Sequence, residues 1–283
     1  MSKILIRFVR DDAKTYAIDD TTLGLVSASG LDEPNIEIYK QSLATVDGDI
    51  VTGTRVGSRI IDLTAKIKNT ALNDVMRRLT TSFFSPAHTY EMYVTRGEET
   101  RYAKECHVDG LEIPTENQNA RLTIKLSMMM PEGYWLSLDS FGENIAGVTP
   151  RCGYPYISYA PYGRIYGVYA YAGTVYLDND GDSEAFCQAV FTANGPVTNP
   201  KIITSKGYVR VIGSMVTGDI LIIDGQKKSV TLNGVNVSNK LDRKSDFSGL
   251  VFDIGTNSIA FSADTGSVSL DVNIYYNKRY LGV

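Results

Sequence analysis

The sequence has few of the residues on which catalytic and metal centres usually depend. It contains two histidines, His88 and His107, three cysteines and one tryptophan. The cysteines, Cys106, Cys152 and Cys187, are odd in number and show no close pairing such as C-x-x-C. This argues against a disulfide framework and against a zinc site. We therefore expect reduced, structural thiols in a chain that folds in a cytoplasm.

Long apolar runs and runs of one charge are also missing. No apolar segment approaches the roughly 20 residues that span a bilayer. Arg7 and Arg10 interrupt the apolar start of the chain before a signal-peptide h-region can form. The net charge is -4, without a long stripe of lysine and arginine, so a surface that follows nucleic-acid phosphates is not expected. We expect neither membrane insertion nor specific nucleic-acid binding.

Motifs for catalysis and for cofactors are missing as well. A Ser-His-Asp or Cys-His arrangement needs a histidine, and Cys106 and His107 are strand neighbours that point to opposite faces. The segment DNDGD, Asp178–Asp182, has calcium-type ligands, but Ser183 and Ala189 stand where an EF-hand has Gly and Glu. A polar turn is expected there.

No P-loop or dinucleotide fingerprint occurs either. We expect no enzyme activity, no cofactor, no resident metal and no catalytic residues. Two alternatives stay open: a metal site that uses both histidines with carboxylates, and a sandwich-fold glycosidase with a carboxylate pair.

What the sequence does contain is a succession of short strand patterns. In the first half, alternating apolar residues predict strands at 3–9, 35–41, 58–67, 89–95, 101–113 and 121–130. One helix is expected to begin near Asn69 or Thr70 and to end before Pro86. Its expected sheet-packing face consists of apolar residues at helical spacing: Leu72, Val75, Met76, Leu79 and Phe83. Arg77 and Arg78, on the other side, are either a solvated face or a phosphate-binding pair.

The second half continues the strand pattern after a segment rich in Gly and Pro, Pro131–Pro150. Strands are predicted at 201–205, 208–213, 219–224, 229–234, 249–254, 258–263 and 268–277. Asp224-Gly225 and Asn233-Gly234 each predict a two-residue type I′ turn. The sequence therefore predicts a mainly β protein of two antiparallel β-sandwich domains, residues 1–133 with one α-helix and residues 134–283.

A tyrosine-rich tract follows the expected junction and runs to Tyr176. Tyrosine suits both half-buried strands and contact surfaces, because it combines a large apolar ring with a hydroxyl. As a hypothetical partner surface we single out the tyrosines at its centre: Tyr156, Tyr159, Tyr162, Tyr166 and Tyr169. The same tract supports the alternative that the chain is a carbohydrate-binding module of a phage tail or cell-surface protein.

Several motifs, in this order along the chain, resemble one known family. GDILIIDGQKKSVTLNG followed by LVFDIGTNSIAFSA, and NPKI before them, are similar to the second half of bacteriophage distal tail proteins, the Dit family. TVDGDIVTGTRVGSRIIDLTAKIKN, the single helix and HTYEMYV are similar to that family's ring-forming domain. The resemblance implies a galectin-like second domain. The galectin sugar site needs His, Arg and Trp, and residues 150–283 contain neither His nor Trp, so sugar binding by that route is not expected.

The resemblance also implies a structural virion protein, assembled in the host cytoplasm and placed at the distal end of the tail. Such a hub is a homo-hexameric ring that joins the tail tube protein to the tail-tip or baseplate proteins. Its further implied partners are the tape measure protein and receptor-binding proteins for host attachment, and DNA passes through the ring without specific binding.

A ring needs two different complementary patches on each subunit, and a hairpin that reaches a neighbour's sheet edge provides one of them. Thr45 to Arg59 is our candidate hairpin. The residues hypothesised to form intersubunit charge pairs are Asp47, Asp49, Arg55 and Arg59. The alternative is an ordinary solvated loop.

Overall fold

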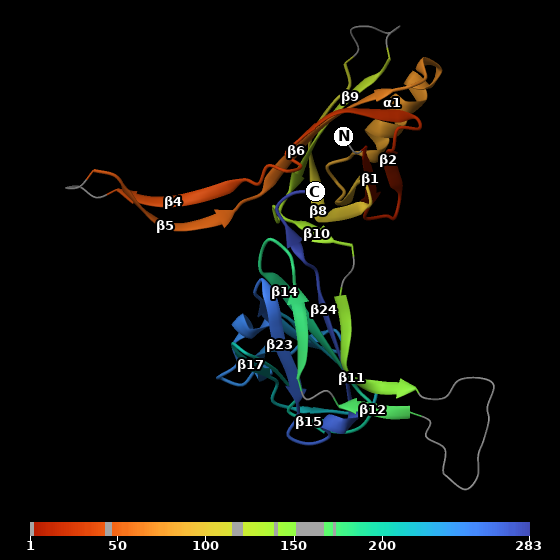
Figure 1. Cartoon of the computed structure of the whole chain (residues 1–283). Coiled ribbons are helices and arrows are strands. Elements are labelled where there is room, and N and C mark those ends of the chain that lie inside the picture. The colour runs from red at the N-terminus through yellow and green to blue at the C-terminus, as the bar shows by residue number, and fades with distance from the viewer. Residues whose placement is uncertain (1–2, 43–46, 115–120, 139–140, 151–166, 172–173) are drawn as a thin grey trace. The chain divides into compact units, whose positions relative to one another are not determined.

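The computed structural model describes residues 3–42, 47–114, 121–138, 141–150, 167–171 and 174–283, with only the backbone described for 141–150 and 167–171. The chain forms two compact units (Figure 1). Unit 1 comprises Met1–Leu138 together with Arg279–Val283, and unit 2 comprises Asp139–Lys278. The strand pairs are antiparallel, and the expected mainly β fold class is confirmed. None of the helices in the described part of the chain is long and apolar enough to cross a membrane.

The body of unit 1 is one sheet that folds over a single core. In spatial order its strands are β2 (Thr15–Ile18), β1 (Ile4–Arg10), β7 (Tyr90–Arg96), β8 (Glu99–Glu112), β9 (Thr123–Met130), β6 (Arg59–Ile67) and β3 (Leu23–Ser29). The long strand β8 pairs with β7 in its first part and with β9 in its second, with a register shift in each pairing. Such bulges bend a strand, so β8 carries the sheet around the core.

The helix has the limits that the sequence predicts. A 3-10 turn, η1 (Thr70–Leu72), leads into α1 (Asn73–Phe83), and the Asn69 side chain accepts a hydrogen bond from Ala71 N at the start of the turn. At the other end, Phe83 and Phe84 pack in a cluster of aromatic rings with Phe8, Tyr16 and Tyr90. The C-terminal end of α1 is therefore fixed to the sheet by aromatic packing.

The expected packing face of α1 is only partly correct. Phe83 is buried and Met76 is half-buried, but Leu72, Val75 and Leu79 are exposed. The position that replaces them on the inner side is Thr80, which is fully buried and hydrogen-bonds the Tyr16 hydroxyl at 2.7 Å. The helix therefore carries a second apolar stripe that the body of unit 1 does not cover.

The last residues of the chain complete unit 1. β25 (Arg279–Tyr280) pairs with β10 (Trp135–Ser137), which in turn pairs with β8. Val283 N donates a hydrogen bond to Asp32 Oδ1 at 2.9 Å. The sequence predicts a junction near residue 134 with all later residues in the second domain. In the structure the chain returns to unit 1, because Trp135 and Tyr280 are paired.

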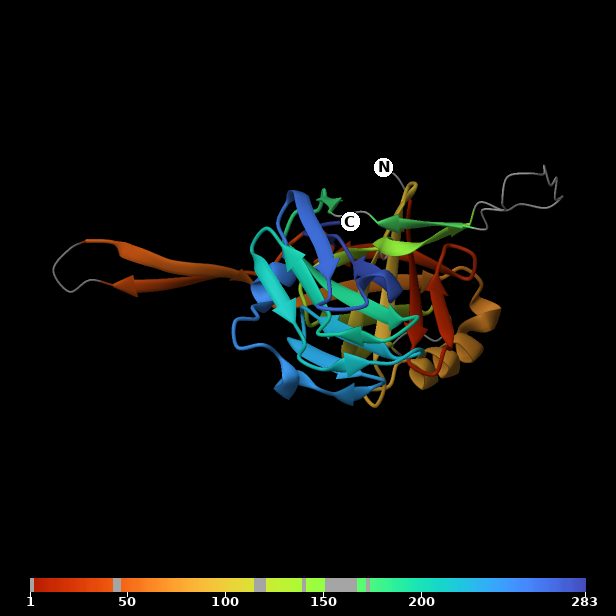
Figure 2. The same ribbon diagram turned by 90° about the horizontal axis from the view of Figure 1, so that it is seen from below.

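Two further strands of unit 1 stand apart from this sheet. β4 (Ile36–Ser42) and β5 (Asp49–Val56) pair only with each other in the described chain. They form a two-stranded ribbon that extends away from the body of unit 1 (Figure 1 and Figure 2). This ribbon is called the arm below.

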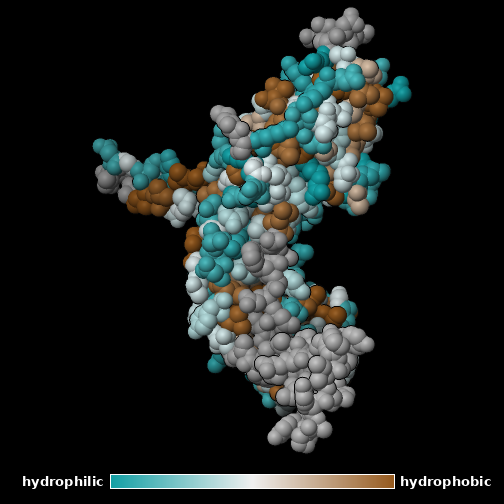
Figure 3. All heavy atoms as spheres, turned by 45° about the vertical axis from the view of Figure 1, so that its right-hand side comes forward, coloured by the Kyte–Doolittle hydropathy of each residue, from teal (hydrophilic) through white to brown (hydrophobic). Residues whose placement is uncertain are grey.

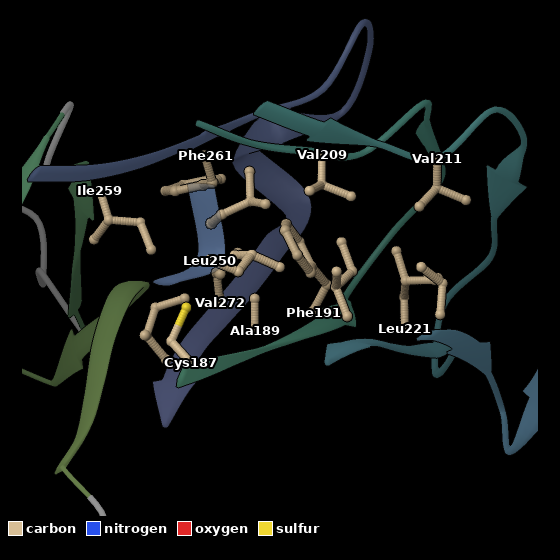
Figure 4. Packing of buried hydrophobic residues seen from close by; sticks show 14 of the residues in the cluster. Cys187, Ala189, Phe191, Val209, Val211, Leu221, Leu250, Ile259, Phe261 and Val272 are labelled. Carbon is tan, nitrogen blue, oxygen red and sulfur yellow. The ribbon is translucent and has the colours of Figure 1, made fainter. Parts of the chain in front are cut away.

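Unit 2 is a sandwich of two sheets. One has the order β12 (Gly167–Tyr171), β11 (Phe141–Pro150), β24 (Leu270–Tyr276), β14 (Ala185–Ala193), β19 (Ile220–Asp224), β20 (Ser229–Leu232) and β21 (Val235–Asn236), with β22 (Val251–Phe252) beside β14. The other has the order β13 (Val175–Asn179), β23 (Gly255–Ser262), β16 (Lys201–Thr204) and β17 (Gly207–Arg210), and a small pair, β15 (Val197–Thr198) and β18 (Ser214–Met215), stands separately. Figure 4 shows Ile259 and Val209 from one sheet facing Ala189 and Phe191 from the other, so the core lies between the sheets.

One of the two predicted type I′ turns is confirmed, and the other is wrong. Asn233 and Gly234 both have positive φ, 50° and 80°, between the paired residues Leu232 and Val235. Asp224 instead pairs with Ser229 across a four-residue loop, so Gly225 does not serve as a turn residue with positive φ. A Cβ at Gly225 would lie 2.8 Å from Cys187 O, so glycine is required there for close packing.

Candidate functional site

The arm exposes large apolar side chains that a folded chain normally buries. Five of them have exposed fractions of 46% to 56%: Ile36, Ile38, Tyr39, Ile50 and Val51. Figure 3 shows hydrophobic residues along the arm. An isolated two-stranded ribbon is marginally stable in water, and exposed apolar area costs roughly 25 cal/mol per Å² relative to its burial. The arm therefore has the character of a surface that another molecule covers.

The strand register sorts these residues onto two faces. Ile36 and Ile38 lie two apart on β4 and share a face, and Val51 joins them because it stands opposite Lys40. The other face carries Tyr39 and, opposite Gln41, Ile50. One face of the arm is thus predominantly aliphatic, while both faces remain open.

Polar contacts stiffen the base of the arm. Glu37 stands directly opposite Arg55, whose Nε donates to Glu37 Oε2 at 2.6 Å, and the Tyr39 hydroxyl donates to the same oxygen at 3.1 Å. The hydrogen bond from Arg55, and to a smaller extent that from Tyr39, holds the pKa of the Glu37 carboxyl below its usual value. Because Arg55 and Glu37 satisfy each other, they hold the ribbon in register.

The four residues hypothesised as intersubunit charges have different environments. Asp47 is exposed near the tip of the arm, and Asp49 accepts a hydrogen bond from Ser42 Oγ at 2.7 Å. Arg55 is exposed on the arm and paired with Glu37. Asp47, Asp49 and Arg55 therefore lie on one exposed element, and their role in an interface stays a prediction.

The hypothesis for Arg59 needs correction, because this side chain is buried. Its exposed fraction is 2%, and its guanidinium donates to the carbonyls of Gly30, Leu31, Gly133 and Leu281. Burial lowers the pKa of Arg59 from its ordinary value, and the Asp32 carboxylate acts in the opposite direction. Arg59 joins three distant segments of unit 1 and is not available to a neighbouring subunit.

The hypothetical tyrosine surface is not described by the structure. Four of its members lie outside the described residues: Tyr156, Tyr159, Tyr162 and Tyr166. Tyr169 lies in β12, for which only the backbone is described. Their role as a partner surface stays a prediction.

The residues considered for chemistry are found in separate environments. Cys106 is buried, and burial raises the pKa of its thiol to about 12, whereas the neighbouring His107 is exposed. His88 Nδ1 lies 2.7 Å from Asp11 Oδ1. In DNDGD, Asn179 is buried and its side-chain amide donates to Ser183 O at 3.0 Å, and Asp180 pairs with Lys278. The contacts of this segment are those of a polar turn.

Sequence reasoning missed the apolar part of the arm. It selected charged residues near the turns and treated 35–41 as an ordinary strand. A signal was nevertheless present: Ile36 and Ile38 alternate with polar residues over 35–41, and nothing in the sequence says which part of the chain covers them.

Comparisons with known proteins agree with this architecture. A model described as the phage tail protein RIFT-related domain matches residues 12–128, and one described as the siphovirus-type tail component, C-terminal domain, matches residues 180–280. Together they cover most of the chain, one match in each unit. The chain is therefore a siphovirus-type phage tail component.

Solved structures share the fold over the whole length. The crystal structure of the Dit protein (gp 19.1) of phage SPP1 is similar with a TM-score of 0.66 and 11% identity, covering 98% of this chain and 99% of that chain. A chain of the phage P2 baseplate, in its activated conformation with Ca, has a TM-score of 0.53 and 12% identity, covering 99% of each chain. No curated protein sequence matches significantly. With the two family models, this shared fold places the chain in the distal tail (Dit) family of siphovirus tail components.

Proposed function

We propose that this protein is the hub at the distal end of a phage tail, where six copies form a ring by means of the arm. The ring joins the tail tube to the tail-tip or baseplate proteins and carries the proteins that attach to the host. One observation carries the proposal: the arm is a self-paired ribbon whose apolar side chains have no cover in the described part of their own chain.

The arm meets the geometric requirement of a closed ring. Ring contacts are heterologous, so one patch of each subunit must meet a different patch of the next. A ribbon that leaves its own domain reaches a neighbour more easily than it reaches the sheet from which it projects. The printed description of the SPP1 protein as a paradigm of a hub adsorption apparatus supports the same role.

The hub function does not require chemistry from this chain. A ring through which DNA passes should not retain it, and a net charge of -4 without a long stripe of lysine and arginine is compatible with passage. The expected partners are the tail tube, tape measure, tail-tip and receptor-binding proteins. Unit 2 is the proposed platform for the receptor-binding proteins.

The first test is the mass of the full chain in solution, measured by light scattering behind size exclusion at several concentrations. We expect a species near six times 31.1 kDa that gives way to monomer on dilution. Ile38→Asp places a charge in the aliphatic face of the arm and should abolish this species, because a charge is not buried without a partner.

Val216→Asp is the matched control. Val216 is 64% exposed and belongs to unit 2, whereas the arm belongs to unit 1, so this variant should assemble like the unmodified chain. A monomer at all concentrations, or hexamers that survive Ile38→Asp, would contradict the proposal.

A further inference from the structure

The second apolar surface of unit 1 lies on α1 and on Leu72, the last residue of η1, which directly precedes α1. Leu72, Val75 and Leu79 have exposed fractions of 38%, 59% and 45%. Their spacing of three and four residues puts them on one face of the helix. They form the helix stripe, which is distinct from the inner face, where Thr80 and Phe83 are buried.

The position of the helix stripe relative to the arm excludes a contact within one chain. In unit 1 the arm projects from one side and α1 lies on the opposite side (Figure 1 and Figure 2). The arm points away from its own helix. A contact between these two surfaces therefore requires a second copy, and repeating it gives the head-to-tail arrangement of a ring.

The dimensions of the two surfaces are compatible. The seven residues of β4 span about 23 Å at roughly 3.3 Å per residue. The 11 residues of α1 span about 16 Å at roughly 1.5 Å per residue. An extended ribbon that crosses or follows the helix covers the whole stripe.

Charge favours the same pairing. Beyond the Glu37–Arg55 pair, the arm carries Asp47, Asp49 and Lys40 and is acidic toward its tip. Arg78 is exposed on α1, three residues after Val75 and therefore next to it on the helix surface. Among the described residues it forms no ion pair. An acidic tip next to a basic flank supports one orientation of the arm.

We infer that the helix stripe, Leu72, Val75 and Leu79, is the docking surface for the arm of a neighbouring copy, with Arg78 facing the acidic tip. This inference rests on the proposed ring and names the surface that receives the arm. The aliphatic face of the arm, Ile36, Ile38 and Val51, covers the stripe.

Cysteine crosslinking between two preparations of the full chain tests the inference. Both carry Cys152→Ser, and the two other cysteines are buried. One preparation carries Ile38→Cys on the arm, and the other carries Val75→Cys on the helix stripe. After mixing and mild oxidation, we expect a disulfide-linked heterodimer at a yield at least about tenfold above that of the control pair.

In the control pair Val26→Cys replaces Val75→Cys. Val26 is 56% exposed, close to the 59% of Val75, but it lies on β3. A charge exchange provides a second measurement: Arg78→Glu should weaken self-association about threefold to fivefold, as expected for one exposed ion pair. Asp49→Lys in the same chain should restore it.

The outcomes separate this inference from the proposed function. Hexamers with the expected crosslink support both. Hexamers in which the arm crosslinks to Val26→Cys as well as to Val75→Cys, or to neither, overturn the helix stripe as the docking surface and leave the ring intact. A chain that stays monomeric and forms no crosslink overturns both.

Discussion

Two strands of unit 1, β4 and β6, have similar sequence patterns but differ in burial. β4 and β6 both contain aliphatic residues that alternate with polar ones, in NIEIYKQ and in SRIIDLTAKI. In β6 every second side chain is buried in the core, whereas in β4 no side chain is buried. The difference lies in the neighbours, since β6 has β3 and β9 on its two sides, whereas among the described strands β4 pairs only with β5.

The comparison shows what strand periodicity means. Alternation predicts that one face of a strand is covered, but it does not say whether the cover comes from the same chain. A strand with the pattern of a core and no core beside it points to a partner outside the chain. We therefore expect changes in the arm to affect assembly and changes in β6 to affect the stability of the folded chain. Three predictions test whether these two effects are separate.

The largest effect is expected from two arginines that stand four residues apart. Arg59→Ala should lower the free energy of unfolding of unit 1 by about 3–5 kcal/mol, because four carbonyls lose their buried donor. Arg55→Ala should leave this free energy unchanged and weaken self-association. Urea unfolding monitored by Trp135 measures the first quantity, because the chain's one tryptophan is buried in unit 1.

Equal unfolding midpoints for Arg59→Ala and Arg55→Ala would contradict this separation. That result would support the original hypothesis that Arg59 is an interface residue. Both variants are compared at a concentration at which light scattering finds monomer, so that assembly does not contribute to the midpoint.

A smaller effect is expected from removing one methylene from each strand. Ile61 on β6 is fully buried, and Ile61→Val should cost about 1 kcal/mol in unfolding free energy. Ile38→Val on the arm should cost less than about 0.5 kcal/mol and should weaken self-association instead. An arm variant that destabilises the monomer as much as the core variant would show that the arm folds against its own chain.

The sequence predicted well those features that local chemistry decides. Strand positions, the limits of α1 and the Asn233-Gly234 turn follow from periodicity, capping and backbone preferences. Arg59 was also predictable: it begins the series Arg59, Ile61, Leu63 on alternate residues, so it lies on the inward face. The hypothesis that Arg59 forms an intersubunit charge pair relies on the charge of its side chain and disregards this alternation.

The remaining features depend on contacts distant in the sequence. The return of Arg279–Val283 to unit 1 requires Trp135 and Tyr280 to be neighbours, which no local signal encodes. The exposure of Val75 and Leu79 depends on where α1 lies on the sheet, since the packed helix turns Thr80 and Phe83 to the inner side. Gly225 was misinterpreted because a packing requirement and a turn requirement select the same residue.

The smallest effect is expected from surface ion pairs, which occur in both regions. In the body of unit 1, Asp20 lies 2.8 Å from Lys3 Nζ and 2.7 Å from Lys68 Nζ. Hydrogen bonds from these two lysines, with the larger contribution from Lys3, lower the pKa of the Asp20 carboxyl to about 2. Because the folded-state pKa is depressed, this contribution to stability is fully present above the ordinary carboxyl pKa near 4. It is lost as the pH falls toward 2.

Asp20→Asn should therefore lower the urea midpoint of unit 1 slightly at pH 7, with a difference that shrinks below pH 4 and vanishes near pH 2. Asparagine is a suitable replacement because Asp20 has a positive φ of 70°, which asparagine tolerates well. The matched variant on the arm is Glu37→Gln, which removes the negative charge from the Glu37–Arg55 ion pair. It should leave the Trp135-monitored midpoint unchanged at every pH. A pH-dependent midpoint for Glu37→Gln would mean that the arm contributes to the stability of its own unit, and the separation between arm and body would fail.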